Sequence, residues 1–144
     1  MISKAMMFAF EKHRGQLCDE GKPYILHPFK VADIVRLVTD DKEIIAAAYL
    51  HDTIEDTATT YDELVEEFSK RVADLVMEVS HEGQKDEVGY YFPRLKTQGG
   101  IMLKFADRLS NLSRMSAWDD GRKEHYLRRS RFWKRKPGDR WEKK

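Results

Sequence analysis

Apolar residues recur at three- and four-residue steps along most of the chain, which is the period of an α-helix. The spacing predicts a first helix with a buried face made of Ile2, Met6, Ala9 and Phe10. Gly15 and the run Gly21-Lys22-Pro23 then indicate a loop. Because no convincing alternating stretch is present, the sequence predicts an all-α fold, a compact helical bundle with little or no β-sheet.

A second helix is predicted to open at His27-Pro28, because proline is favoured at the first helical position. This places His27 at or near the helix N-cap. The buried stripe of the helix is expected to hold Val31, Ile34, Val35 and Val38. A third helix is predicted over residues 42–52, and its stretch 44–50 is apolar all round, which indicates a central position.

The second half of the chain also has a helical pattern. Thr60 with Glu63 makes a capping box that starts a helix. Its apolar face is expected to run through Leu64, Val65, Phe68, Val72, Leu75, Val76 and Val79. Residues 81–89 are polar and predict a loop.

A helix is then predicted from Ile101 to about Met115, after Gly99-Gly100. Its buried face is expected to use Leu103, Ala106, Leu109 and Leu112. A last helix is expected over about residues 121–134.

The length of 144 residues favours a single domain, and 41% hydrophobic residues are enough for one core. Cys18 is the single cysteine, so the chain forms no internal disulfide, which is typical of a reducing, cytoplasmic setting. No apolar run approaches the roughly 20 residues that cross a bilayer. Residues 1–10 are apolar but contain Lys4 and lack a cleavage pattern, so we expect no signal peptide.

Charge is unevenly distributed although the net charge is only +1. Residues 122–144 carry 11 Lys and Arg against three Asp and Glu. Such a segment is either a solvated tail or a surface for nucleic acid or another polyanion.

The third predicted helix is nearly all apolar, yet it ends in the polar run His51-Asp52-Thr53-Ile54-Glu55-Asp56. Burying charge without a partner costs several kcal/mol, and a divalent cation would offset that cost. On a continuous helix, Glu55 shares a face with His51, and Asp56 shares one with Asp52.

A second polar site lies in the predicted helix after Gly100, where Asp107 interrupts an apolar pattern and Asn111 follows one turn later. Each residue alone has an ordinary structural explanation. His27 fits a helix cap, Asp52 fits a turn, and Asp107 fits an ion pair with Arg108 or Arg114. A shared metal site accounts for all of them together, because charged groups are rarely buried unpaired.

Two imidazoles and two carboxylates favour Mn²⁺, Fe²⁺, Zn²⁺ or Mg²⁺. Such an ion lowers the pKa of a bound water and polarises a phosphoryl oxygen. Glu55 and Asp56 are candidates to take the proton of the water or to give one to the leaving oxygen, and the sequence does not separate these roles.

Three stretches together resemble a known family. They are Gly21-Lys22-Pro23-Tyr24-Ile25-Leu26-His27-Pro28, His51-Asp52-Thr53-Ile54-Glu55-Asp56-Thr57, and Lys104-Phe105-Ala106-Asp107-Arg108-Leu109-Ser110-Asn111. They are similar to the H…HD…D signature of the HD superfamily, and in particular to the hydrolase domain of RelA/SpoT proteins and their small stand-alone homologues. The resemblance spans about residues 5–118.

This resemblance implies an HD-type phosphohydrolase domain over residues 1–135, followed by a basic tail over 136–144. It implies a Mn²⁺-dependent enzyme that removes the 3′-pyrophosphate of (p)ppGpp through a metal-activated water. The metal ligands would be His27, His51, Asp52 and Asp107. Glu55 and Asp56 would activate the water, and Asn111 would contact the nucleotide.

The chain departs from the family at one place. Cys18-Asp19 stand where the family has Arg-Lys, whose cations stack on guanine and meet phosphate. A different nucleotide substrate is therefore an alternative. The others are a non-catalytic module that binds metal, nucleotide and, through the basic tail, RNA or another polyanion, and a metal-free helical scaffold.

Overall fold

The computed structural model describes residues 1–18, 20–80, 85–86, 89–90, 95–113, 120–121 and 123. The elements assigned there are α1 (Ile2–Lys12), α2 (Leu26–Arg36), α3 (Lys42–Leu50), α4 (Thr53–Asp56), α5 (Tyr61–Glu67), α6 (Lys70–Val79), β1 (Lys85–Asp86), β2 (Gly89–Tyr90) and α7 (Gln98–Leu112). The all-α prediction is confirmed. A two-residue antiparallel pairing of β1 with β2 lies in the segment that was predicted as a loop.

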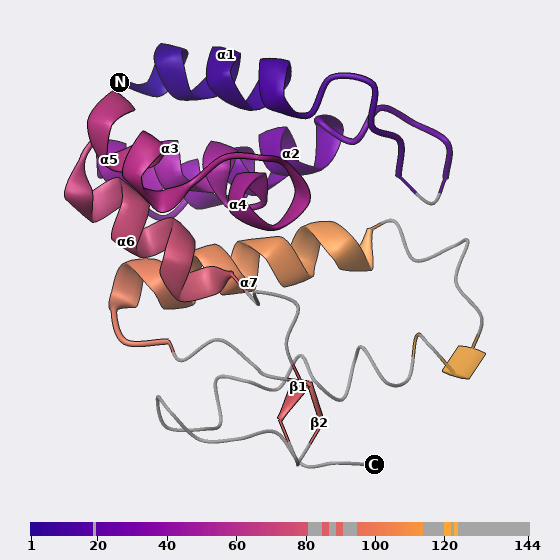
Figure 1. Cartoon of the computed structure of the whole chain (residues 1–144). Coiled ribbons are helices and arrows are strands. Elements are labelled where there is room, and N and C mark those ends of the chain that lie inside the picture. Colours follow the sequence, from indigo (N-terminus) through magenta and orange to yellow (C-terminus); the bar gives the residue numbers. More distant parts are fainter. Residues whose placement is uncertain are drawn as a thin grey trace.

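Helix α3 is the centre of the fold. Residues 44–50 are all buried, as the continuous apolar run predicted. The helix packs against α1, α2, α6 and α7, and Figure 1 shows α1 and α7 on opposite sides of it. Leu50 is fully buried, and burial of such a side chain contributes about 1.5–3 kcal/mol. The polar residues that follow Leu50 therefore emerge directly from the core.

Four helices are preceded by an N-cap residue whose side-chain oxygen accepts a hydrogen bond from a backbone N–H of the first turn. These residues are Asp41 for α3, Thr60 for α5, Ser69 for α6 and Thr97 for α7. The predicted cap at Thr60 is confirmed. The apolar face that was predicted to run on to Val79 belongs to two helices, because Ser69 caps a new helix.

Helix α2 begins at Leu26, one residue before the predicted start, and its N-cap is Ile25. His27 is therefore inside the first turn, and its N–H donates to the carbonyl of Tyr24. A proline anywhere in the first turn removes an N–H that has no helical partner, so Pro28 is tolerated there. The helix ends at Arg36, which leaves Val38 beyond it and exposed.

Helix α3 ends at Leu50, two residues earlier than predicted, and α4 is a separate short helix. The Thr53 hydroxyl donates to the carbonyl of Leu50 at 2.7 Å and satisfies one of the acceptors that the helix end leaves open. His51 and Asp52 form the turn between the two helices. The predicted faces shared by residues 51 and 55, and by 52 and 56, assumed a continuous helix, which the structure does not have.

Some predicted buried positions are exposed. Phe10, Leu109 and Leu112 are 44%, 51% and 37% exposed. Ala5, Arg108 and Ser110 are buried in the same helices. Helix α7 begins at Gln98 and includes Gly99, where a Cβ would lie 3.0 Å from Leu75, so the glycine permits close packing there.

Helix α7 ends at Leu112 with Ser113 as its C-cap, earlier than the predicted end near Met115. The basic tail lies outside the described residues, as does the helix over 121–134 apart from residues 121 and 123. Among the described residues, none of the helices combines the length and the apolar character that crossing a bilayer requires.

Candidate metal centre

Three of the predicted metal ligands meet at one point inside the bundle. His27 comes from the first turn of α2, His51 from the end of α3 and Asp107 from the middle of α7. The Nε2 atom of His27 lies 2.9 Å from Asp107 Oδ1, and that of His51 lies 3.3 Å from the same oxygen. Each residue offers one ligand atom, and these atoms lie within 4.8 Å of one another.

Asp52 faces the same point. Its Oδ2 atom lies 3.1 Å from His51 Nε2 and 3.6 Å from His27 Nε2. The turn between α3 and α4 makes this possible, because Asp52 leaves the direction of the helix axis with φ −101° and ψ 0°. The structure therefore brings all four predicted ligands together, with Asp52 beside the group formed by His27, His51 and Asp107.

Both imidazoles are held through their other nitrogen. His51 Nδ1 lies 2.8 Å from the carbonyl oxygen of Ala48, and His27 Nδ1 lies 2.8 Å from Ser110 Oγ. A carbonyl oxygen only accepts, so the proton of a neutral His51 is on Nδ1 and the lone pair is on Nε2. An outer hydrogen bond of this kind orients metal-bound histidines in proteins.

The donor set fits a divalent cation. The Nε2 atom of His51 is buried and has no hydrogen-bond partner among the described residues, although two carboxylate oxygens lie near it. Burial lowers the pKa of His51, but the charge of Asp52 and then the nearby Asp107 carboxylate raise it well above the ordinary value. Burial raises the pKa of Asp107, but the hydrogen bond with His27 and then the nearby His51 imidazole bring it well below the ordinary value. The cluster thus favours positive charge at its centre.

Lys104 is a member of this cluster that the sequence reasoning did not single out. It is buried, and its Nζ lies 3.8 Å from Asp107 Oδ2. Burial, and then the charge of Arg108, lower the pKa of Lys104 to about 8. The sequence signal was its place three residues before Asp107, one helical turn away.

The loop between α1 and α2 supplies a second set of polar residues that sequence reasoning missed. Gln16 Nε2 donates to the backbone carbonyl of Asp56 at 2.9 Å, and its Oε1 lies 2.8 Å from Nδ1 of buried His13. This chain of contacts links the end of α1 to the end of α4. Tyr24, from the same loop, contacts Asp52.

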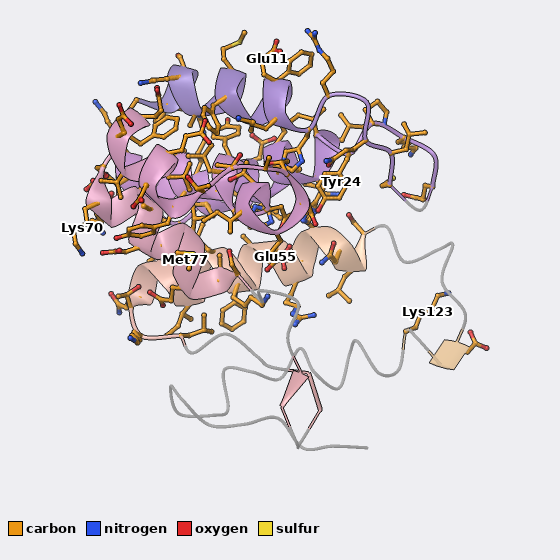
Figure 2. The ribbon with its side chains drawn as sticks, in the orientation of Figure 1. Glu11, Tyr24, Glu55, Lys70, Met77 and Lys123 are labelled. Atoms are coloured by element: carbon orange, nitrogen blue, oxygen red, sulfur yellow. The ribbon has the colours of Figure 1, made fainter. Side chains whose placement is uncertain are left out.

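Glu55 and Asp56 are the exposed residues of α4, directly after the turn that carries Asp52. Figure 2 shows Glu55 where α4 approaches α7, with Tyr24 nearby on the same side of the bundle. Burial of the Asp56 carboxyl and then the charge of Asp52 raise the pKa of Asp56. A raised pKa brings a carboxyl group closer to the range in which it both accepts and releases protons.

Asn111, Cys18 and Asp19 are the remaining residues that the sequence analysis considered for the site. Asn111 is half-buried on α7, one turn after Asp107. Cys18 is half-buried in the loop, whereas Asp19 lies outside the described residues.

Known proteins resemble this chain over most of its length. The HD domain family matches residues 5–89. The guanosine-3′,5′-bis(diphosphate) 3′-pyrophosphohydrolase of Aquifex aeolicus (strain VF5) is 43% identical over 119 residues, which cover 77% of this chain and 17% of that protein. The similarly named protein MESH1 of Danio rerio is 36% identical over 143 residues, which cover 88% of this chain and 78% of MESH1.

A solved structure of a metazoan ortholog of SpoT, described as hydrolysing ppGpp, has the same fold. It superposes with a TM-score of 0.72 and 25% identity, and the match covers 90% of this chain and 81% of that one. The long bacterial relatives differ in extent, because this chain spans 10–17% of the length of those from Aquifex, Myxococcus xanthus and Haemophilus influenzae.

Proposed function

This chain belongs to the HD-domain family and is related to the SpoT and MESH1 proteins, and we propose that it is a metal-dependent hydrolase that removes the 3′-pyrophosphate of (p)ppGpp. The observation that carries the proposal is the convergence of His27, His51 and Asp107, with Asp52 beside them, on one buried point. The two relatives named as 3′-pyrophosphohydrolases supply the substrate class.

In this proposal His27, His51, Asp52 and Asp107 hold one divalent ion, and Mn²⁺ is the first candidate. When bound, such an ion polarises a phosphoryl oxygen and lowers the pKa of a water molecule. Imidazole and carboxylate ligands suit Mn²⁺, Fe²⁺ and Zn²⁺, so activity should be measured with each of these ions.

The reaction requires the oxygen of water to bond to the phosphorus on the ribose 3′-oxygen, while the bond from that phosphorus to the 3′-oxygen breaks. One proton leaves the water and one proton reaches the 3′-oxygen, so the products are GDP or GTP and pyrophosphate. Glu55 and Asp56 are the proposed carriers of these protons, because both are solvent-accessible acids on α4 beside Asp52. Asn111 is the proposed contact to the nucleotide.

The buried cation Lys104 has a supporting role in this scheme. Its charge faces Asp107, Glu55 and Asp52 and offsets part of the repulsion among these carboxylates. The single cysteine supports a reducing compartment, and we propose the cytoplasm.

The test is turnover of ppGpp, pppGpp and a panel of other nucleotides by the purified chain with Mn²⁺. GDP and pyrophosphate from ppGpp are the expected products. Asp52→Ala should lose metal and turnover together, whereas Asp33→Ala, an exposed acid on α2, should keep both. Turnover confined to another nucleotide would support the alternative substrate. Metal binding with no turnover of any nucleotide would instead support a binding module.

A further inference from the structure

Tyr24 is not one of the four predicted metal ligands, but it contacts one of them, Asp52. Its hydroxyl donates a hydrogen bond of 2.5 Å to Asp52 Oδ2. The same oxygen lies 3.1 Å from Nε2 of His51 and 3.6 Å from Nε2 of His27. The hydroxyl therefore acts on a carboxylate oxygen that faces both imidazoles, as Asp107 Oδ1 also does.

The rest of Tyr24 is fixed by contacts on two sides. Its ring packs edge-on against the His27 ring at 5.8 Å, and it lies 5.2 Å from the ring of His13. Its backbone carbonyl accepts the N–H of His27 at 3.0 Å. Tyr24 in the α1–α2 loop thus contacts two of the predicted ligands, His27 in α2 and Asp52 in the turn after α3.

The hydroxyl is a permanent donor. A phenol has an ordinary pKa of about 10 and keeps its proton at neutral pH, and a carboxylate oxygen only accepts, so the hydroxyl is the donor in this contact. A carboxylate oxygen has more than one lone pair, so it accepts a hydrogen bond and coordinates an ion at the same time.

We propose that Tyr24 is a positioning residue for the metal centre: its hydroxyl fixes the Asp52 carboxylate with Oδ2 turned toward the ion and thereby raises the affinity for a divalent metal. Each imidazole has an outer contact, His51 to Ala48 and His27 to Ser110, and the Tyr24 hydroxyl gives Asp52 the corresponding contact. The proposal rests on the metal centre described under the proposed function.

The test measures binding of Mn²⁺ alone, by calorimetry or electron paramagnetic resonance, with no nucleotide present. Tyr24→Phe keeps the ring contacts and removes only the hydroxyl. Its Mn²⁺ affinity should fall about 10- to 100-fold, the usual effect of removing an outer-sphere partner. Tyr61→Phe is the matched control, because the Tyr61 hydroxyl donates at 2.5 Å to Asp74 on the exposed surface between α5 and α6. Its affinity should equal that of the wild type.

Installing p-aminophenylalanine at position 24 restores an N–H donor at the same place on the ring, and it should recover most of the lost affinity. Unfolding of Tyr24→Phe in the presence of a chelator shows whether the metal-free variant folds. If it folds poorly, the rescue variant still tests the role of the donor at position 24. Unchanged affinity in Tyr24→Phe, or no gain from the amine, would overturn the role of Tyr24 and leave the metal centre intact. A wild-type chain that binds no divalent metal would overturn both proposals.

Discussion

Asp107 Oδ1 lies 2.9 Å from Nε2 of His27, although 80 positions separate the two residues in the chain. The contact joins the first turn of α2 to the middle of α7, and Ser110 on α7 holds the other nitrogen of the same imidazole. The packing of α2 against α7 therefore builds half of the metal centre.

Metal binding should stabilise the fold, because the folded chain assembles the ligands and the unfolded chain does not. At a Mn²⁺ concentration of 100 times the dissociation constant, the free energy of unfolding should rise by about 2.7 kcal/mol. Asp107→Asn should lose this gain. Chemical denaturation with Mn²⁺ and with a chelator measures both values, and an equal gain in Asp107→Asn would place the bound metal elsewhere.

Glu55 and Asp56 should affect turnover without affecting the metal. Neither contributes to the His-His-Asp group, and both are exposed residues of α4. Glu55→Gln and Asp56→Asn should each keep the Mn²⁺ affinity and slow kcat by roughly 10²- to 10⁴-fold for a general acid or base. Steady-state kinetics on both variants separates their roles, and full activity in both would remove them from the mechanism.

Gln16 should matter for turnover because it anchors the end of α4. A four-residue helix has little stability of its own, and the Gln16 amide supplies an external contact to the Asp56 carbonyl. Gln16→Ala should lower kcat about tenfold while the Mn²⁺ affinity stays within twofold, on the premise that misplacing a reacting group by a fraction of an ångström is costly. The comparison is Gln98→Ala, an exposed glutamine at the start of α7. A loss of similar size in Gln98→Ala would argue against a local effect.

The metal ligands were predictable because a charged side chain at the end of a buried apolar helix, or inside one, requires a compensating partner. His51, Asp52 and Asp107 carry that signal in the sequence itself. Lys104 has only the weaker signal of its place one helical turn before Asp107, and Tyr24 and Gln16 have none, because tyrosine and glutamine are ordinary at exposed positions. Their roles arise from contacts across the fold, such as the 40 positions between Gln16 and Asp56.

The order of the main helices was predictable, but their number and their ends were less so, because the face predicted from Thr60 to Val79 belongs to two helices and α4 is separate. The caps at Asp41 and Ser69 use side chains that also occur in turns, and the hydrogen bond of the Thr53 hydroxyl to Leu50 at the end of α3 has no counterpart in the apolar spacing. Periodicity also misplaced Leu109, because apolar spacing alone does not show which face a neighbouring helix covers.

Gly100 should be required for the full stability of the fold, because the Glu78 carboxylate occupies the space beside it. A Cβ at position 100 would collide with that carboxylate. Glu78 accepts hydrogen bonds from the backbone N–H groups of Lys96 and Thr97 and from the Thr97 hydroxyl, at 2.7–3.0 Å. Gly100→Ala should therefore destabilise the fold by about 1–3 kcal/mol through loss of these bonds.

A double-mutant cycle tests this explanation. Once Glu78→Ala has removed the carboxylate, adding Gly100→Ala should be neutral or stabilising, because alanine is the better helix former. Additive losses, measured by urea unfolding, would show that the clash with Glu78 is not the cause.

Asp41 should contribute a pH-dependent part of the stability. Hydrogen bonds from Arg71, at 2.8 and 2.9 Å, hold the pKa of Asp41 below its usual value in the folded chain. A lowered folded pKa means that the contribution is fully present above the unfolded pKa of about 3.9 and is lost as the pH falls through the folded value. Asp41→Asn keeps an oxygen for the α3 cap but has no charge to lose.

The free energy of unfolding should therefore be higher in the wild type than in Asp41→Asn at neutral pH, and the difference should shrink below about pH 4. Urea unfolding of both chains across this range gives the comparison. A difference that stays constant down to acid pH would assign the effect of Asp41 to the cap alone.

The most direct test of the metal centre is an anomalous difference map from crystals grown with Mn²⁺. We expect one strong peak within coordination distance of His27 Nε2, His51 Nε2, Asp52 and Asp107. A peak bound by other residues, or none beside these four in a crystal soaked at saturating Mn²⁺, would contradict the assignment.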